Sequence, residues 1–512
     1  MGKYITSIDL GSSKIAIATG CLTEAGVRIV SYREVPSTGI KNGEIINIYQ
    51  VEQTVSQLIG MAEEDIGEKI EQAILNVSAK FLHRETGTFS VHRTNPANYI
   101  SMEELESITK ARHNTRNESG ELLLEAFPIK YSIDEYAGIS FREAIGMMGT
   151  DIEAEFLMIF GKESLISCRR QILDKCGVTI KKFILSPIAS ARAVLNETEL
   201  ENGVALVDIG RGTTEIAIIR DNAVLDVASI PFAGDSITND IKSVANITAK
   251  WAEEIKLQRG NCCPEIVPEN SKLVFKNRDG ITEGDLDLNL LTNIIEDRTV
   301  EILDTVRHIL DSSKWSGKLS SGVVITGGTA YLENIRQLAQ AVLGRNVRLA
   351  APRTAITNDS VEAAFDAYSS VAVGLVLEGF SPKLSHADDI TLPKGDAGNN
   401  EKWTIFNGLF GNEGGPAEAE PVKDKGKKSK EDEKRRKEEE EKRRKEEEKQ
   451  KKEDEKRRKE EEEKRRKEEA KQKKEDDKRR KEEEKERKKE ERRNRSKAFF
   501  DTLFSDNTND NA

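Results

Sequence analysis

Two copies of one short pattern dominate this chain: Ile8-Asp9-Leu10-Gly11-Ser12-Ser13-Lys14 and, 199 positions later, Val207-Asp208-Ile209-Gly210-Arg211-Gly212-Thr213-Thr214. In each copy an apolar strand runs into an Asp, then into a turn of glycine and hydroxyl residues, and then into a second apolar strand. Such a turn points backbone N–H and hydroxyl groups into one concave space that suits phosphate oxygens. Two copies at this separation predict two similar halves that grip one polyphosphate between them.

The Asp of each turn, Asp9 or Asp208, cannot bind phosphate directly because like charges repel. We expect these two carboxylates to hold Mg²⁺ or to orient a water molecule. A third turn, Gly327-Gly328, follows the apolar strand expected at 322–326. The simpler alternative, that each glycine only supplies a tight turn, would require three such turns to arise independently at matching strand ends.

Strand and helix patterns alternate through most of the chain, which indicates an α/β architecture. We expect strands at 4–9, 15–20, 27–34, 73–77, 180–185, 204–209 and 322–326. We expect helices at 51–64, 164–176, 186–195, 236–245, 248–257, 290–310 and 369–378. Residues 83–161 break this alternation and predict an α+β insert, with strands at 87–93, 127–133 and 152–160 and a helix at 101–112 that Ser101 and Glu104 cap.

The charge is distributed unevenly along the chain. The net charge of −11 combines a segment at 423–495, with about 38 Lys and Arg against 29 Asp and Glu, with an acidic body before it. An acidic body argues against sequence-independent binding to nucleic acid. The five cysteines contain no C-x-x-C pair, which favours reduced thiols in a cytosol. No apolar run approaches the roughly 18 residues of a membrane span.

The charged segment at 423–495 follows a linker rich in Gly, Asn, Pro and Asp at 381–422. It repeats with a period of 22 residues and contains one apolar residue, Ala470, so it lacks the apolar seam of a coiled coil. Many Glu residues precede a Lys or Arg by four positions, an order that stabilises an isolated helix. We therefore expect a single charged helix, and a disordered polyampholyte is the alternative.

The C-terminal residues 496–505 combine an apolar face with cations just upstream, and 506–512 are expected to be a disordered tail. On a helix one face would carry Phe499, Phe500, Leu503 and Phe504. An apolar wedge beside cations is typical of a helix that lies in a membrane interface. A peptide that docks into a protein groove is the alternative. A second candidate anchor lies at 403–410, with Trp403, Phe406, Leu409 and Phe410.

Taken together, these motifs resemble the actin-like ATPase superfamily, in which two Asp turns are phosphate loops and a Thr-Gly-Gly turn lies at the adenosine. Within it, the stretches at 37–45, 252–256, 346–349 and 370–375 are similar to the FtsA family of bacterial cell-division proteins. The resemblance covers about residues 1–380 and implies a two-lobed fold with duplicated ribonuclease-H-like subdomains. Its implied subdomains are 1A at 1–82, 162–195 and 356–380; 1C at 83–161; 2A at 196–235 and 306–355; and 2B at 236–305.

The resemblance also implies a site for ATP and Mg²⁺. Lys14 would reach the phosphates as a point charge, and Asp9 and Asp208 would organise Mg²⁺ through water and act as the catalytic pair. The other nucleotide contacts that it implies are Gly11, Ser12, Ser13, Gly210, Gly212, Thr213, Thr214, Gly234, Asp235, Glu253, Lys256, Gly327 and Gly328. Gly234 and Asp235 would form the turn at the sugar, and Glu253 and Lys256 would contact ribose and adenine. A solvated helix face is the alternative for the last two.

Two residues depart from the family pattern. Arg211 stands where the family usually has Gly, and Glu215 stands where it usually has Asp. Arg211 would either shrink the pocket for the terminal phosphate or supply an extra cation. No residue that would position an attacking water is identifiable from the sequence. The expectation is therefore ATP binding with weak or no ATPase activity.

For function, the resemblance implies an actin-like protein that polymerises on the cytoplasmic side of the inner membrane at the division septum. Its implied partners are the tubulin-like GTPase FtsZ, other copies of itself, an anionic membrane surface and later division proteins. Arg298 and Glu301 are expected to face an FtsZ peptide, because Arg can pair with an acidic tail; a surface ion pair between them is the alternative. The alternative functions on this fold are a small-molecule kinase and a chaperone-type ATPase. A small-molecule kinase needs neither the charged segment nor a membrane helix. A chaperone-type ATPase needs a peptide groove, which a segment with one apolar residue cannot form.

Removal of residues 496–512 should abolish flotation of the chain with anionic liposomes, because the apolar wedge supplies most of the membrane affinity. Liposome flotation of the full and shortened chains measures this directly. A chain with Trp403 and Phe406 changed to Ser tests the second candidate anchor at 403–410 in the same assay. Equal flotation of the full and shortened chains would remove the C-terminal helix as the anchor.

Overall fold

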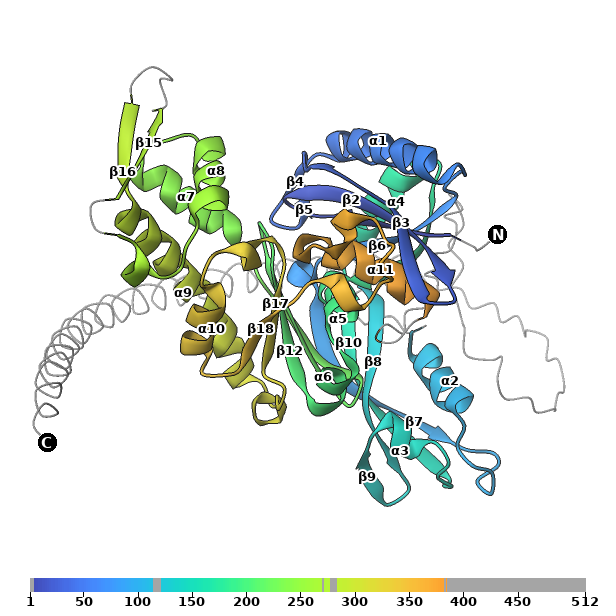
Figure 1. Cartoon of the computed structure of the whole chain (residues 1–512). Coiled ribbons are helices and arrows are strands. Elements are labelled where there is room, and N and C mark those ends of the chain that lie inside the picture. The colour runs from blue at the N-terminus through green and yellow to red at the C-terminus, as the bar shows by residue number, and fades with distance from the viewer. Residues whose placement is uncertain (1–3, 114–120, 269–270, 277–282, 382–383, 385–512) are drawn as a thin grey trace, which may run out of the picture. The chain divides into compact units, whose positions relative to one another are not determined.

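The computed structural model describes residues 4–113, 121–268, 271–276, 283–381 and 384. The predictions for the charged segment at 423–495, the helix at 496–505, the tail at 506–512 and the second anchor at 403–410 lie outside these residues, as does nearly all of the linker. The described part contains two five-stranded sheets, a four-stranded sheet, two two-stranded pairs and the helices that pack on them (Figure 1).

The first sheet is built around the first Asp turn. Its strands are β1 (Ile5–Leu10), β2 (Lys14–Thr23), β3 (Gly26–Pro36), β6 (Gln72–Val77) and β11 (Thr179–Leu185). Their order is β11-β6-β1-β2-β3, with β1, β2 and β3 antiparallel and β6 and β11 parallel to β1. Every residue of β1 is buried, because helices cover both faces of the sheet: α1 (Ile48–Ile66) and α4 (Glu163–Lys175) on one side, α5 (Ser186–Val194) and α11 (Ser370–Phe380) on the other (Figure 1).

The second sheet repeats the plan of the first. Its strands are β12 (Val204–Ile209), β13 (Thr214–Arg220), β14 (Ala223–Ile230), β17 (Val323–Thr326) and β18 (Val347–Leu349), in the order β14-β13-β12-β17-β18. Three antiparallel strands are again followed by two parallel ones. The turns match as well, since Gly11 N donates to Lys14 O at 3.1 Å and Gly210 N donates to Thr213 O at 3.0 Å. The predicted duplication into two similar halves is confirmed.

Residues 83–161 form a separate antiparallel sheet, as the change of pattern predicts. Its order is β7-β10-β8-β9, with β7 (His83–His92), β8 (Leu122–Ile133), β9 (Tyr136–Ile139) and β10 (Asp151–Gly161). Two helices, α2 (Met102–His113) and α3 (Phe141–Ala144), accompany it, and the insert has its own apolar cluster. Ser101 Oγ accepts from Glu104 N at 3.2 Å, so the Ser101 half of the predicted cap of α2 is confirmed, whereas the Glu104 carboxylate accepts from Arg93.

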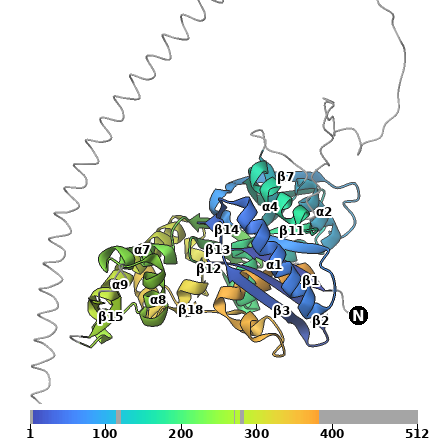
Figure 2. The same ribbon diagram turned by 90° about the horizontal axis from the view of Figure 1, so that it is seen from above.

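The remaining helices and strands lie mostly beside the second sheet. They are α6 (Glu197–Asn202), α7 (Gly234–Val244), α8 (Ala249–Arg259), α9 (Leu288–Ser312), α10 (Ile335–Leu343) and the two-stranded pairs β4–β5 (Ile40–Lys41, Glu44–Ile45) and β15–β16 (Lys272–Lys276, Glu283–Asp287). Short 3-10 helices lie at η1 (Ala79–Phe81), η2 (Pro264–Ile266), η3 (Ser316–Lys318), η4 (Gly328–Tyr331), η5 (Pro352–Thr354), η6 (Glu362–Phe365) and η7 (Ala367–Ser369). In Figure 2, α7, α8, α9 and β15 gather at one end of this body, away from α1 and β1–β3.

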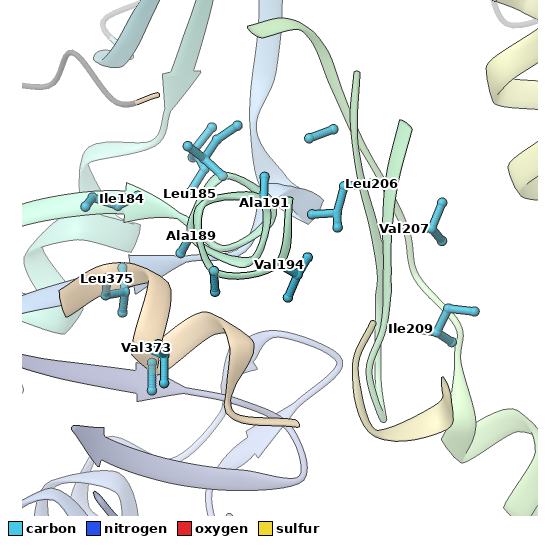
Figure 3. Close-up of a cluster of buried hydrophobic side chains, with 14 of the residues drawn as sticks. Ile184, Leu185, Ala189, Ala191, Val194, Leu206, Val207, Ile209, Val373 and Leu375 are labelled. Carbon is cyan, nitrogen blue, oxygen red and sulfur yellow. The ribbon is translucent and has the colours of Figure 1, made fainter. Parts of the chain in front are cut away.

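Helices α5 and α11 pack directly on each other in the middle of the body. Figure 3 shows α5 between the side chains of α11, such as Val373 and Leu375, and Leu206 of β12, while Val207 points to the opposite face of its strand. The helices approach so closely that a Cβ added at Gly374 would lie 1.8 Å from the Ala189 carbonyl oxygen. The contact between the helices therefore holds the two halves at a set distance.

In the part of the chain that the structure describes, no helix has both the length and the apolar character needed to cross a membrane.

Substitution of Gly374 by Ala should lower the free energy of unfolding by at least about 2 kcal/mol, because α5 and α11 must separate to admit the methyl group. The measurement is urea-induced unfolding followed by circular dichroism. Gly60 is the matched control, since it lies inside α1 with no atom within 4 Å of an added Cβ. Gly60→Ala should raise the free energy of unfolding by about 0.5–1 kcal/mol. Similar effects of the two changes would contradict the packing argument.

Candidate functional site

The two Asp turns and the Gly-Gly turn line one cavity of about 750 Å³ between the two five-stranded sheets. This volume lies within the range of about 300–1,000 Å³ that is typical of small-molecule sites. The predicted site residues that line it are Asp9, Gly11, Ser12, Ser13, Lys14, Asp208, Gly210, Gly212, Thr213, Glu253, Lys256, Gly327 and Gly328. The tertiary fold thus brings together groups that are far apart in the sequence.

The turns approach each other too closely for side chains at two of their glycines. A Cβ at Gly212 would lie 2.8 Å from both Asn42 Cα and Ser12 Oγ. Gly327 has a φ of +92°, and a Cβ there would lie 2.3 Å from Asp208 Oδ1. Glycine at these positions keeps a narrow cradle open between backbone donors and hydroxyls, which is the shape that phosphate oxygens require. The residues present therefore fit a nucleotide polyphosphate.

Three predicted contacts support the second turn from behind and do not line the cavity. Thr214 is fully buried, and its hydroxyl donates to Phe232 O at 3.0 Å. Gly234 N donates to Gly210 O at 3.2 Å, and Asp235 N donates to Arg211 O at 2.7 Å. These bonds hold the N-terminus of α7 against the turn, and a direct contact of these residues with a nucleotide stays a prediction.

Asp9 is buried, Asp208 is partly buried, and hydrogen bonds hold both carboxyls in place. Asp9 Oδ1 accepts from Asn76 Nδ2 at 2.7 Å, and Asp208 Oδ2 accepts from Ser190 Oγ at 2.5 Å. The pKa of Asp9 is raised to about 7, chiefly by burial, while Lys14 opposes the shift and the nearby Asp208 adds to it. Burial also raises the pKa of Asp208.

Glu215 is a third carboxyl that lines the cavity, and it is buried. Ser78 Oγ, from the opposite half, donates to its Oε1, and Oε2 has no hydrogen-bond partner in the part of the chain described. Burial raises the pKa of Glu215 to about 8. Three such carboxyls at one cavity favour a bound cation, which would offset their repulsion. Among the described residues, however, no group of three or more His, Cys, Asp or Glu side chains could hold a metal directly.

Lys14 lines the cavity, but protein groups already hold its ammonium. Nζ donates to the Tyr32 hydroxyl at 2.5 Å and to the Glu34 carboxylate, and it lies 3.9 Å from the ring centroid of Tyr368. Burial lowers the pKa of Lys14, and the Glu34 carboxylate partly offsets that effect. The sequence does not reveal these partners, because they come from β3 and from η7, far along the chain.

Glu253 and Lys256 lie on α8 and face the cavity, so they are not part of a solvated helix face. The Lys256 ammonium donates to Glu253 Oε2 at 2.8 Å, to Thr238 Oγ1 at 2.9 Å and to Gly234 O at 3.1 Å. Burial lowers the pKa of this Lys. The pair therefore closes one side of the cavity as a hydrogen-bonded unit.

Several residues that line the cavity were not predicted from the sequence: Glu34, Asn76, Ser78, Ser186, Tyr331, Asp366 and Tyr368. Asn76 is the one that left a signal, as a polar residue inside the apolar run at 73–77 of strand β6. Its side chain joins the end of β1 to the site, because Oδ1 accepts from Leu10 N at 2.8 Å while Nδ2 donates to Asp9.

Arg298 and Glu301, the predicted contacts with a partner peptide, lie on α9. Arg298 Nη1 donates to Glu301 Oε2 at 2.5 Å, so the ion pair that formed the alternative is present. Arg298 Nε also donates to Asp240 Oδ2 of α7 at 2.5 Å, a partner that the sequence did not reveal. The peptide contact stays a prediction.

Sequence comparison supports the resemblance drawn from the motifs. A family model described as cell division protein FtsA matches residues 205–374. The FtsA of Pseudomonas aeruginosa is 28% identical over 383 residues, covering 74% of this chain and 89% of that protein. The FtsA of Bacillus subtilis is 27% identical over 361 residues (68% and 79%), and that of Escherichia coli is 28% identical over 396 residues (75% and 91%).

Structure comparison supports the fold. The structure titled PilM-PilN type IV pilus biogenesis complex aligns with a TM-score of 0.52 at 15% identity, covering 74% of this chain and 99% of that chain. The fold is actin-like, and the prediction of fold class is confirmed for the described residues.

The stability of the chain without ligand should fall as pH rises from about 5 to 8. The folded chain keeps a proton on Asp9, whose pKa is raised from 3.8 to about 7, over an interval in which the unfolded chain has released it. Asp9→Asn cannot ionise, so this variant should lose about 2–3 kcal/mol less than the wild type over that interval. Urea unfolding at several pH values measures the difference.

Asp134→Asn is the control for the pH experiment. The backbone N–H groups of Asp151 and Thr150 donate to Asp134 and lower its pKa, so it is ionised in both states over the interval tested. This variant should keep the pH dependence of the wild type. Equal pH dependence for wild type and Asp9→Asn would show that Asp9 is not held protonated.

Proposed function

We propose that this chain, which belongs to the FtsA family of cell-division proteins, binds ATP with Mg²⁺ and tethers the FtsZ ring to the membrane. The observation that carries the nucleotide proposal is the position of the twin turns. Two hairpins of the same geometry face one cavity from opposite sheets, and the Gly-Gly turn completes its wall.

Different residues of the cavity would bind the phosphates and the Mg²⁺ ion. Backbone N–H groups and the hydroxyls of Ser12, Ser13 and Thr213 would bind the phosphates. Asp9 and Asp208 would hold Mg²⁺ through water molecules, and the ion would supply positive charge to offset that of the phosphates. Asp9 and Asp208 would orient those waters, since Asn76 and Ser190 hold their side chains in place.

Binding is better supported than hydrolysis. Asp9, Asp208 and Glu215 all have raised pKa values, and a nearby cation would stabilise their ionised forms. No described side chain stands out as the group that would position an attacking water. We therefore propose that ATP serves chiefly to set the conformation of the chain, with weak or no turnover.

Membrane attachment and polymerisation belong to the same proposal. A single short amphipathic helix binds membranes weakly. Many copies in one filament would add their affinities without new contacts. ATP contacts both halves through the twin turns, so its binding would close the cavity and favour the conformation that polymerises. The similarity to FtsA proteins supports a role for this activity in cell division, with a peripheral position at the cytoplasmic face of the inner membrane.

FtsZ is the proposed partner of the region at 236–305, and later division proteins would join through other surfaces. The Arg298 guanidinium lies about 29% exposed on α9, between Asp240 and Glu301. An acidic peptide would have to compete with these carboxylates for the same guanidinium. This exchange of partners suits a contact with FtsZ that forms and dissociates during assembly of the ring.

Asp208→Ala should abolish measurable ATP binding and, with it, the ATP-dependent recruitment of FtsZ to liposomes. The variant removes the carboxylate that would hold the Mg²⁺ water shell in the second half of the site. Isothermal titration with Mg·ATP measures the first effect, and co-flotation of FtsZ with liposomes measures the second.

Asp174→Ala, an exposed carboxylate on α4, is the control and should behave as the wild type in both assays. Unchanged ATP binding in Asp208→Ala would contradict the proposed site. FtsZ that fails to float with the wild-type chain and ATP would remove the tether from the proposal.

A further inference from the structure

Arg211 occupies the second turn, at the position where the family resemblance leads us to expect glycine, and it lines the cavity. Its Nε donates to Asp235 Oδ1 at 2.7 Å, and Asp235 N donates back to Arg211 O at 2.7 Å. Asp235 lies in the first turn of α7. One edge of the guanidinium is therefore fixed to a regular helix.

Three cations line the cavity within the described residues, and two of them are already occupied. An ammonium has three donors, and Lys256 uses all three on Gly234 O, Thr238 Oγ1 and Glu253 Oε2. The charge of Lys14 is neutralised by the Glu34 carboxylate. Neither ammonium can pair fully with a phosphate unless it first gives up these contacts.

Arg211 is different because most of its donors remain available. A guanidinium has five N–H donors in a planar fork. Nε is used by Asp235, and Nη1 and Nη2 form no hydrogen bond with another described residue. The side chain is 38% exposed. The edge formed by Nη1 and Nη2 has the geometry that binds two oxygens of a phosphate at once.

The cavity keeps room for a ligand beside Arg211. With the guanidinium in place the cavity still measures about 750 Å³. Arg211 therefore does not close the site to a nucleotide. What it adds is a fixed positive charge beside the backbone donors of the second turn.

We propose that Arg211 is a specificity-determining residue that contacts the outer phosphates of the nucleotide, and that Asp235 is its positioning residue. This inference rests on the nucleotide site proposed above. The contact selects ligands by the number of their phosphates, since a monophosphate lacks the oxygens that the guanidinium would reach. With Arg211, the affinity of the second turn for a nucleotide depends on the number of phosphates as well as on the backbone donors of the turn.

The test compares dissociation constants for ATP, ADP and AMP, each with Mg²⁺, in the wild type and in Arg211→Gln. The variant should bind ATP about tenfold or more weakly, because a charge-assisted bidentate contact is lost. ADP binding should weaken less, and AMP binding should stay within about twofold of the wild type. Arg211→Lys and Asp235→Asn should give intermediate losses, because the first keeps the charge without the fork and the second keeps the fork without its anchor.

Arg220→Gln is the matched control, since Arg220 lies at the other end of β13 with a side chain that is 35% exposed. It should leave all three dissociation constants unchanged. Circular dichroism melting curves check that each variant folds. If Arg211→Gln does not fold, Asp235→Asn decides: a reduced preference for ATP over AMP supports the proposal, and an unchanged preference overturns it.

The outcomes separate this inference from the function on which it rests. A wild-type chain that binds no nucleotide overturns both. A wild-type chain that binds ATP, with Arg211→Gln binding it equally well, overturns only the role of Arg211. Equal weakening for ATP, ADP and AMP also overturns it, because that pattern is the mark of a general structural effect.

Discussion

Helices α5 and α11 touch at a point where there is room for no side chain, since a Cβ on Gly374 would lie 1.8 Å from the Ala189 carbonyl oxygen. Both helices pack on the first sheet, and α5 also packs on β12 and β13 of the second. Their contact therefore sets the distance between the sheets. The close approach of Gly212 to Ser12 and Asn42 at the strand ends depends on that distance, and so does the cavity between the turns.

The cavity concentrates charge that the fold alone does not need. Asp9 and Glu215 are buried, Asp208 is partly buried, and loss of water around each carboxyl raises its pKa. A protein selected only for stability would place apolar side chains at these positions, because an uncompensated buried carboxyl weakens folding. Natural proteins keep residues that weaken folding in this way mainly at functional sites. Asn76 donates a hydrogen bond to Asp9 and Ser190 donates one to Asp208, so the surrounding fold holds these two carboxyls in place.

Sequence reasoning succeeded where the signal is local and failed where it is weak or distant. The strands on either side of each Asp turn, the insert and the cap of α2 were all predicted. Helix α10 was missed although its apolar residues recur at helical spacing, and the hairpin β15–β16 was missed because its short strands are rich in Lys, Asp and Glu. Thr214 was expected at the phosphates, yet its hydroxyl turns to Phe232 O, because the side chains of a strand alternate between faces.

The sequence by itself determined the duplication and the chemistry of the turns, because a hairpin with glycine and hydroxyl residues depends on neighbours only a few positions away. Only the tertiary structure decided which charges meet. Lys14 pairs with Glu34 beneath the ring of Tyr368, Arg211 pairs with Asp235, and Arg298 pairs with Asp240. These partners lie on different elements, so their meeting depends on how sheets and helices pack. Packing depends on many weak contacts along the whole chain, so no single stretch of sequence predicts which charged residues meet.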